Sequence, residues 1–266
     1  MPAARTRAPK SANPKGAKAD APRMTLTDVM KALEKAGSAQ AKKTYTRHGA
    51  SEPMFGVSFA TLGVLVKKIG VDHALALRLW DTGNFDARNL AFKIADPAGM
   101  APADLDRWAR DTNVRMCAGY VSMLAAEGSQ GFATATRWLA SGEEQMRCAG
   151  WGLVGQLAAR DEATPDAWFS ERLAQVEKTI HGAPNAERGP MNAAVISIGG
   201  RSAALKKSAL AAAKRIGKVE VDHGDTDCKT PDAASYVDKM WAHAKAKGFD
   251  SPSAQERQRE SPRTRC

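Results

Sequence analysis

The chain has 266 residues, of which 43% are hydrophobic, and a formal net charge of +10. A chain of this length and composition can bury one sizeable hydrophobic core or two small ones. Its apolar runs fall well short of the ~20 residues that cross a bilayer, and no apolar signal segment opens the sequence, which excludes a membrane protein and indicates a soluble one. The four cysteines form no C-x-x-C pair, so we expect reduced thiols and a cytoplasmic protein.

The positive charge is concentrated at the two ends of the chain. Six Lys or Arg and a single Asp give residues 1–23 a balance of +5, and residues 251–266 contribute +2, which leaves about +3 for the residues between. Neither end has a periodic apolar pattern with which to offset the entropy of ordering. We therefore expect disordered basic tails at 1–23 and 251–266, flanking one folded domain over residues 24–250.

Signals for helices begin directly after the first tail. Thr25, with Asp28 three residues later, forms a capping-box pattern, and Gly37 marks the end of that helix. The apolar spacing predicts further helices over residues 39–47, 59–69 and 72–80, and later ones that end near residues 180, 198, 216 and 247. No alternating pattern is longer than residues 218–222, so we expect no sheet.

Three more helix starts are predicted from short motifs. Ser141 and Glu144 have the spacing of a second capping box. Residues 164–167 and 230–233 both read Thr-Pro-Asp-Ala, which combines an N-cap residue, a proline at the first helical position and an acid in the first turn.

The middle of the chain repeats a unit that begins with arginine. An arginine lies near the start of four successive helical runs, each after a short polar break, at Arg88, Arg115, Arg147 and Arg188. Residues 117–120 and 148–151 read Cys-Ala-Gly-Tyr and Cys-Ala-Gly-Trp. The intervals between the arginines, 27, 32 and 41 residues, fall where paired-helix repeats fall. The sequence therefore predicts an all-α fold, an α-α superhelix of HEAT- or armadillo-like repeats with disordered basic tails.

Two interpretations of these arginines stay open. A helix N-terminus carries partial positive charge, so an arginine in the first turn is mildly unfavourable unless it serves an anion. Helix-start N–H groups and guanidinium forks both suit phosphate, which favours DNA binding by all four side chains. Alternatively, arginine–carboxylate ladders join neighbouring repeats, with nearby acids as partners: Asp86, Glu143, Glu144 and Glu187.

A basic helix over residues 205–218 supplies further candidates for DNA binding. Lys207, Lys214 and Lys218 recur on one face of it, and Lys229 follows in the next loop. A solvated helix face is the alternative interpretation. The lysines matter for binding only if they line the same groove as the arginines.

Residues 222–229 form an acidic loop that contains ligand types for a metal. Asp222, His223, Asp225, Asp227 and Cys228 lie there. A polar turn that caps the helix beginning near residue 230 is the interpretation we prefer, and we predict no metal. The chain also has no phosphate-loop or dinucleotide-binding motif, so we predict no cofactor.

Several of these segments together resemble the DNA alkylation repair family. The resemblance rests on Tyr45 with Phe55-Gly56-Val57, on the Leu79-Trp80 and Arg88-Asn89-Leu90-Ala91 unit, on the Arg147 unit and, most specifically, on residues 219–233. It covers roughly residues 25–247. It implies a superhelix of HEAT-like repeats with a concave basic groove.

The resemblance also implies an activity. Active members of the family are DNA glycosylases that remove N3- and N7-alkylated purines while gripping the duplex backbone, without flipping the damaged base. An aspartate near the sugar and tryptophans that pack the deoxyribose carry the catalysis. A carboxylate suits this reaction because it stabilises an oxocarbenium-like transition state, and phosphate contacts supply affinity without base readout.

The chain departs from this pattern at its centre. Val114 and Ala118 occupy the places of the tryptophan and the catalytic aspartate, and residues 112–126 contain no carboxylate. Arg147 does match an arginine of the family's groove. Asp111 and Asp222 are the weak candidates for a relocated catalytic carboxylate.

Three functions follow. The first is a DNA-binding protein of this family that grips alkylated or non-specific duplex DNA, with glycosylase activity at low efficiency at most. The second is a non-enzymatic helical-repeat scaffold for a protein partner, with the arginines as structural ladders. The third is a glycosylase that uses Asp111 or Asp222.

Overall fold

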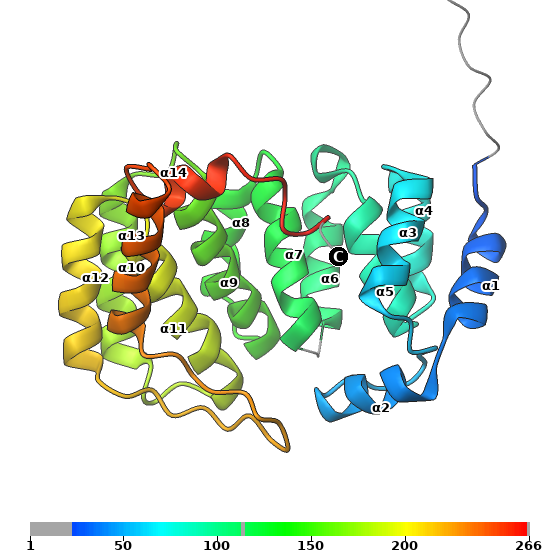
Figure 1. Cartoon of the computed structure of the whole chain (residues 1–266), viewed down its shortest axis with the longest axis horizontal. Coiled ribbons are helices and arrows are strands. Elements are labelled where there is room, and N and C mark those ends of the chain that lie inside the picture. Colours follow the sequence, from blue (N-terminus) through cyan, green and yellow to red (C-terminus); the bar gives the residue numbers. More distant parts are fainter. Residues whose placement is uncertain (1–22, 113–114, 265–266) are drawn as a thin grey trace, which may run out of the picture.

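The computed structural model describes residues 23–112 and 115–264, without the side chains of residues 115–118. This part of the chain consists of helices joined by loops and contains no strand, so the all-α prediction is confirmed (Figure 1). No helix in the described ranges is long and apolar enough to cross a membrane.

The helices form pairs, as the repeat pattern predicts. We call α5, α7, α9, α11 and α13 the stacked row, because each packs against the next. The helix before each of them, α4, α6, α8, α10 or α12, is its pair partner. The stacked row comprises α5 (Phe85–Ile94), α7 (Arg115–Glu127), α9 (Glu144–Arg160), α11 (Asn185–Gly199) and α13 (Ala233–Ala246). The partner helices are α4 (His73–Asp81), α6 (Pro102–Asp111), α8 (Gly131–Leu139), α10 (Asp166–Thr179) and α12 (Ala203–Ile216).

The remaining helices lie at the two ends of the array. The N-terminal ones are α1 (Leu26–Ala36), α2 (Ala39–Arg47) and α3 (Phe59–Ile69), a short 3-10 turn η1 (Pro97–Gly99) follows α5, and α14 (Pro252–Arg257) closes the chain. In Figure 1 the paired helices stand side by side, and α14 with the chain end runs across their upper ends.

The predicted caps are confirmed in one case and shifted in others. Thr25 and Asp28 form the reciprocal capping box, and Gly37 is the C-cap. Ser141 does not cap α9: its hydroxyl accepts from the N–H of Glu143, and the helix begins at Glu144. The two Thr-Pro-Asp-Ala motifs start their helices later than predicted, because α10 begins at its Asp and α13 after its Asp.

Asp86 has a structural function that the sequence did not reveal. Its fully buried carboxylate accepts hydrogen bonds from the backbone N–H groups of Phe55, Gly56 and Val57, at 2.6, 3.0 and 2.8 Å. Asp86 is therefore not an arginine partner. It fixes the loop before α3 against the first turn of α5, since a buried charge is stable only when it is hydrogen-bonded in this way.

The expectation of a disordered C-terminal tail is wrong for residues 251–264, which we call the C-terminal strap. Its α14 packs against α9 and α13. Arg263 is only 4% exposed and donates to Glu127 at the end of α7 and to the carbonyl oxygens of Phe92 and Ala95 at the end of α5. The buried Lys93 donates in return to the carbonyl oxygen of Arg263, at 2.8 Å.

The strap thus contacts the C-terminal ends of four helices of the stacked row, α5, α7, α9 and α11. Apolar periodicity predicts burial of hydrophobic faces. It does not predict the order of a segment such as the strap, which is held by charged donors at helix C-termini. Cations and carbonyl oxygens attract each other there. The predicted N-terminal tail, residues 1–23, lies outside the described residues except for Arg23.

Candidate nucleic-acid interface

Three of the four predicted arginines have described side chains, and they lie in the first turns of α5, α9 and α11 in the stacked row. We call Arg88, Arg147 and Arg188 the arginine rim. Arg88, on α5, donates to the carboxylate of Asp111 at 3.4 Å and to the carbonyl oxygen of the same residue at 3.3 Å. Its guanidinium also lies 4.6 Å from the centre of the Trp80 ring. Arg88 therefore joins its own repeat to the turn before α7.

Arg147, on α9, makes the strongest contact of the rim. Its Nε and Nη2 donate to Glu187 at 2.9 and 2.6 Å, and its Nη1 donates to the carbonyl oxygen of Ser141. Glu187 lies in the first turn of α11 and is 4% exposed. The hydrogen bonds that Arg147 donates to this carboxylate raise the pKa of its guanidinium above its usual range. Both N–H groups converge on one carboxylate oxygen, and such charge-assisted hydrogen bonds are stronger than neutral ones.

Arg188 continues the pattern on α11. It donates to the carbonyl oxygen of Ala183 at 2.8 Å and, in the loop after α12, to that of Glu220 at 3.3 Å. The arginine–carboxylate ladder is thus observed for Arg88 and Arg147, although only Glu187 among the predicted acids is a partner, whereas Arg188 donates to backbone carbonyl oxygens. Glu143 pairs instead with Arg110. About a quarter of the Arg88 and Arg147 side chains, 26% of each, remains exposed. The side chain of Arg115 lies outside the described residues.

A cavity of about 590 Å³ lies between the helices that carry Arg147 and Arg188, and we call it the main cavity, although no rim side chain lines it. It is lined by α7, α9 and α11, with His223 from the loop before α13. Much of its wall consists of small residues: Gly119, Gly152, Gly155, Ala186, Gly189, Ala193 and Ala194. A Cβ atom built on Gly119 or Gly189 would meet nothing within 4 Å. The wall therefore admits a close backbone approach by a ligand.

The set of residues that lines the main cavity was not identified from the sequence. Glu144, Cys148, Trp151 and Gly155 line it at a spacing that puts them on one face of α9. This spacing could have indicated in the sequence that one face of the helix lines a cavity. Small residues at helical intervals are, however, also typical of close helix packing. Gly152, on the same face, shows this second use, because a Cβ there would lie 2.6 Å from the hydroxyl of Ser122 on α7.

Neither weak candidate for a catalytic carboxylate lines the main cavity. Asp111 accepts from the Trp80 indole at 3.1 Å in addition to Arg88. Asp222 accepts from the N–H of Gly224, and its backbone N–H and carbonyl oxygen pair with the Asn185 side chain. Glu144 is the carboxylate that the cavity wall contains.

The predicted lysines do not line the main cavity either. Lys207 and Lys214 are exposed on α12, a partner helix. Lys218 pairs with Glu220 at 2.6 Å, and together with Lys229 it lines a separate cavity of about 470 Å³ against the loop before α13. In that loop His223 contacts the hydroxyl of Thr230 at 3.0 Å. Within the described ranges no three His, Cys, Asp or Glu side chains form a group that would hold a metal.

A sequence profile described as DNA alkylation repair enzyme matches residues 29–236. The chain belongs to the DNA alkylation repair family. Two curated relatives are the uncharacterized proteins Lin0241 of Listeria innocua and Lmo0209 of Listeria monocytogenes. Each is 26% identical over 204 residues, which cover 74% of this chain and 88% of the relative.

A solved structure is more similar. It is described as a new family of proteins related to the HEAT-like repeat DNA glycosylases with affinity for branched DNA structures. This chain is 32% identical to it, with a TM-score of 0.77 over 85% of this chain and 97% of that one. The HEAT-like prediction is confirmed, and the family resemblance found in the sequence is confirmed with it.

Proposed function

We propose that this member of the DNA alkylation repair family binds DNA along its stacked row, with the sugar-phosphate backbone in the main cavity and the arginine rim at one edge. A solved relative is described as having affinity for branched DNA structures. The observation that carries the proposal is the main cavity, whose glycine-rich wall suits a ligand that must approach closely, and whose helices α9 and α11 carry Arg147 and Arg188 in their first turns.

The ladder and the DNA contact are compatible functions of the rim. The five N–H donors of a guanidinium exceed what a single carboxylate accepts, and about a quarter of the Arg88 and Arg147 side chains is open to solvent. Holding the side chains in place lowers the entropy that binding must offset. Contacts of this kind read the backbone and not the bases, so we expect binding of duplex DNA with little sequence preference and a steep dependence on salt.

The main cavity offers a direct test of this proposal. In Gly189→Leu the new side chain projects into open space inside the cavity and replaces a poor helix former. The protein should therefore stay folded while the side chain occupies the position of the ligand. We expect affinity for duplex DNA to fall by about tenfold or more, equivalent to about 1.4 kcal/mol.

Gly142→Leu is the matched control. Its Cβ also meets nothing within 4 Å, but Gly142 lies in the loop before α9 and does not line the main cavity. Equal DNA affinity in wild type and Gly189→Leu would overturn the proposed groove. If the wild type binds neither duplex nor branched DNA, the scaffold function remains, in which a protein segment occupies the main cavity.

Excision of alkylated purines is a separate matter from binding. The chain has Val114 and Ala118 where active members carry tryptophan and aspartate. Loss of such preorganised electrostatic stabilisation typically costs ~3 kcal/mol or more. We therefore propose that release of 7-methylguanine is slow or undetectable, and that Asp111→Asn does not change it. Robust release by the wild type would contradict this, and Glu144→Gln would then be the first variant to assay, because Glu144 is the carboxylate of the cavity wall.

A further inference from the structure

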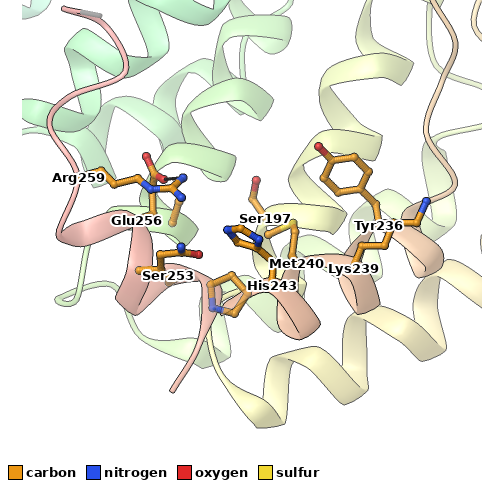
Figure 2. Close-up of a pocket in the computed structure, with 11 residues that line it drawn as sticks. Ser197, Tyr236, Lys239, Met240, His243, Ser253, Glu256 and Arg259 are labelled. Atoms are coloured by element: carbon orange, nitrogen blue, oxygen red, sulfur yellow. Dashed lines mark hydrogen bonds and ion pairs between the residues drawn. The ribbon is translucent and has the colours of Figure 1, made fainter. Parts of the chain in front are cut away.

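A second cavity, of about 400 Å³, lies between α13 and the C-terminal strap, and we call it the strap cavity. Figure 2 shows Tyr236 and Lys239 at one end of it, Glu256 and Arg259 at the other, and Ser197, Met240 and His243 between them. Its volume falls within the roughly 300–1,000 Å³ of small-molecule sites. Neither the arginine rim nor the main cavity accounts for it.

Tyr236 is unusual among the aromatic side chains of this protein. It is 48% exposed, whereas the large tryptophans of the fold, Trp80, Trp108 and Trp138, are buried. An exposed aromatic ring at the mouth of a cavity is a stacking surface for a planar ligand. Met240 supplies an apolar floor beside it, and the exposed His243 supplies a second ring one turn further along α13.

The charge at the strap cavity is positive and partly uncompensated. Its carboxylate, Glu256, is already held by Arg160 at 2.9 Å and by Arg259 at 3.2 Å. Among the described residues, the Lys239 ammonium has no carboxylate within ion-pair distance, although the neighbouring Asp238 on α13 is taken up by Lys206. A cation without a protein partner beside an exposed aromatic ring suits a ligand that carries both a phosphate and a planar ring.

The strap cavity adjoins the main cavity. Ser197 on α11 lines both of them, and Gly155 on α9, which lines the main cavity, packs against the Ser197 hydroxyl. A DNA strand whose backbone lies in the main cavity can therefore pass one nucleotide into the strap cavity without leaving the surface of the protein.

We propose that the strap cavity binds one unpaired nucleotide of a DNA strand, with the base stacked on Tyr236 and the phosphate next to Lys239. This inference rests on the proposed DNA binding by the main cavity and deepens it. The inference predicts that the protein prefers DNA with an unpaired arm, which is present where a branch opens. A fully paired duplex has no free base for this site and uses the main cavity alone.

The test compares two DNA molecules: a blunt duplex, and the same duplex carrying one single-stranded arm with 2-aminopurine at its first unpaired position. Dissociation constants are measured at fixed salt by anisotropy of an end label, and stacking is measured by the 2-aminopurine emission. The wild type should prefer the DNA with the arm by about tenfold, because stacking on an aromatic ring contributes 1–3 kcal/mol per base by alanine substitution. It should also quench the 2-aminopurine.

Tyr236→Ala should lose both the preference and the quenching while keeping its affinity for the blunt duplex. Tyr236→Phe should keep both, because the ring remains. Lys239→Gln should reduce the salt dependence of binding for the DNA with the arm by about 0.7, the value for one phosphate of a single strand. Phe132→Ala is the matched control, since Phe132 is 45% exposed but lies on α8, away from either cavity.

The outcomes separate the two proposals. A wild type that binds both DNAs equally, or a Tyr236→Ala variant that still prefers the arm, overturns the strap-cavity site and leaves the main cavity untouched. A preference for the arm that disappears in Tyr236→Ala, in a protein whose affinity for the blunt duplex is unchanged by Gly189→Leu, supports the strap cavity while overturning the proposed groove. Failure of the wild type to bind either DNA overturns both.

Discussion

The two edges of the stacked row use arginine in opposite electrostatic settings. At the N-terminal edge Arg88, Arg147 and Arg188 lie where helix N-termini carry partial positive charge. At the C-terminal edge Arg263 lies among carbonyl oxygens at the ends of α5 and α7. A cation is disfavoured in the first setting and favoured in the second. The rim arginines therefore rely on acceptors outside their own helices, a carboxylate for Arg88 and Arg147 and carbonyl oxygens for Arg188, whereas Arg263 combines the Glu127 carboxylate with carbonyl oxygens at the helix ends.

This difference shows that a row of arginines on a repeat protein identifies a binding surface only after its protein acceptors have been counted. The rim is positively charged, but each described guanidinium is already a bond between repeats. The α13 side of the strap cavity has fewer cations than the rim, but one of them, Lys239, has no carboxylate partner among the described residues. The four predictions below test this comparison, beginning with the largest effect.

Arg147→Met should be the most destabilising change. It leaves Glu187, whose side chain is 6% exposed, as a buried carboxylate without its cation. Breaking a buried pair in this way costs about 3–5 kcal/mol. The measurement is the free energy of unfolding in urea. The double variant Arg147→Met with Glu187→Gln should recover most of the loss, because the uncompensated charge is then gone. Absence of recovery would mean that packing of the arginine stem, and not its charge, holds the two repeats together.

Arg263→Ala should destabilise by a smaller amount, about 2–3 kcal/mol. The change frees buried carbonyl oxygens, each of which costs about 1–3 kcal/mol when unsatisfied. Its carboxylate partner Glu127 is 21% exposed, however, and can be hydrated once the arginine is removed. Arg215→Ala is the control, because the Arg215–Glu177 pair is exposed and screened by solvent, so its loss should leave the stability nearly unchanged.

Amide hydrogen exchange localises the effect of Arg263→Ala. Protection should fall in the C-terminal strap and in the last turns of α5 and α7, since these are the segments that Arg263 joins. A uniform loss of protection over the whole chain would show that the strap and the repeats unfold as one unit.

Asp161 should give the next effect, about 1 kcal/mol, and one that depends on pH. It is the C-cap of α9, at the same edge as the strap. Burial raises its pKa, but hydrogen bonds from the Thr164 hydroxyl and from the N–H groups of Ala163 and Thr164 outweigh burial, so the pKa lies below its ordinary 3.8. The folded state therefore prefers the ionised form.

That sign fixes the expected pH profile. The contribution of Asp161 to stability is fully present above its unfolded pKa and disappears as the pH falls through the lower folded pKa. Wild type and Asp161→Asn should thus differ by about 1 kcal/mol at pH 7, the typical net contribution of a hydrogen bond, and converge in acid below pH 3.8. If the difference in stability between the two proteins is the same in acid, its cause is the shape of the side chain and not its charge.

The sequence predicted the array better than it predicted the contacts between repeats. The starts of α1, α2 and α3 follow from local caps such as Thr25 with Asp28, because all partners lie within three residues. The partner of Arg147 lies 40 residues away, and several acids competed for it by sequence alone. The strap was missed because Arg263 is buried through hydrogen bonds 136 and 171 residues distant, which leave no periodic apolar pattern.

The smallest effect on DNA binding is expected from the lysines of α12. Lys207 and Lys214 were candidates because they share a face of a basic helix, but α12 is a partner helix, and neither side chain lines the main cavity or the strap cavity. Charges about a Debye length or more from the phosphates, roughly 8 Å at physiological salt, are largely screened. Lys207→Gln with Lys214→Gln should therefore change the affinity for duplex DNA by less than about twofold and leave the salt dependence unchanged, because no phosphate contact is lost. Neutralising two charges elsewhere, in Arg88→Gln with Lys239→Gln, removes the same net charge and should lower the salt dependence by about one phosphate contact or more. Equal effects in the two double variants would mean that net charge alone draws DNA to this protein, and the distinction between a rim, a cavity and a solvated helix face would then have no bearing on binding.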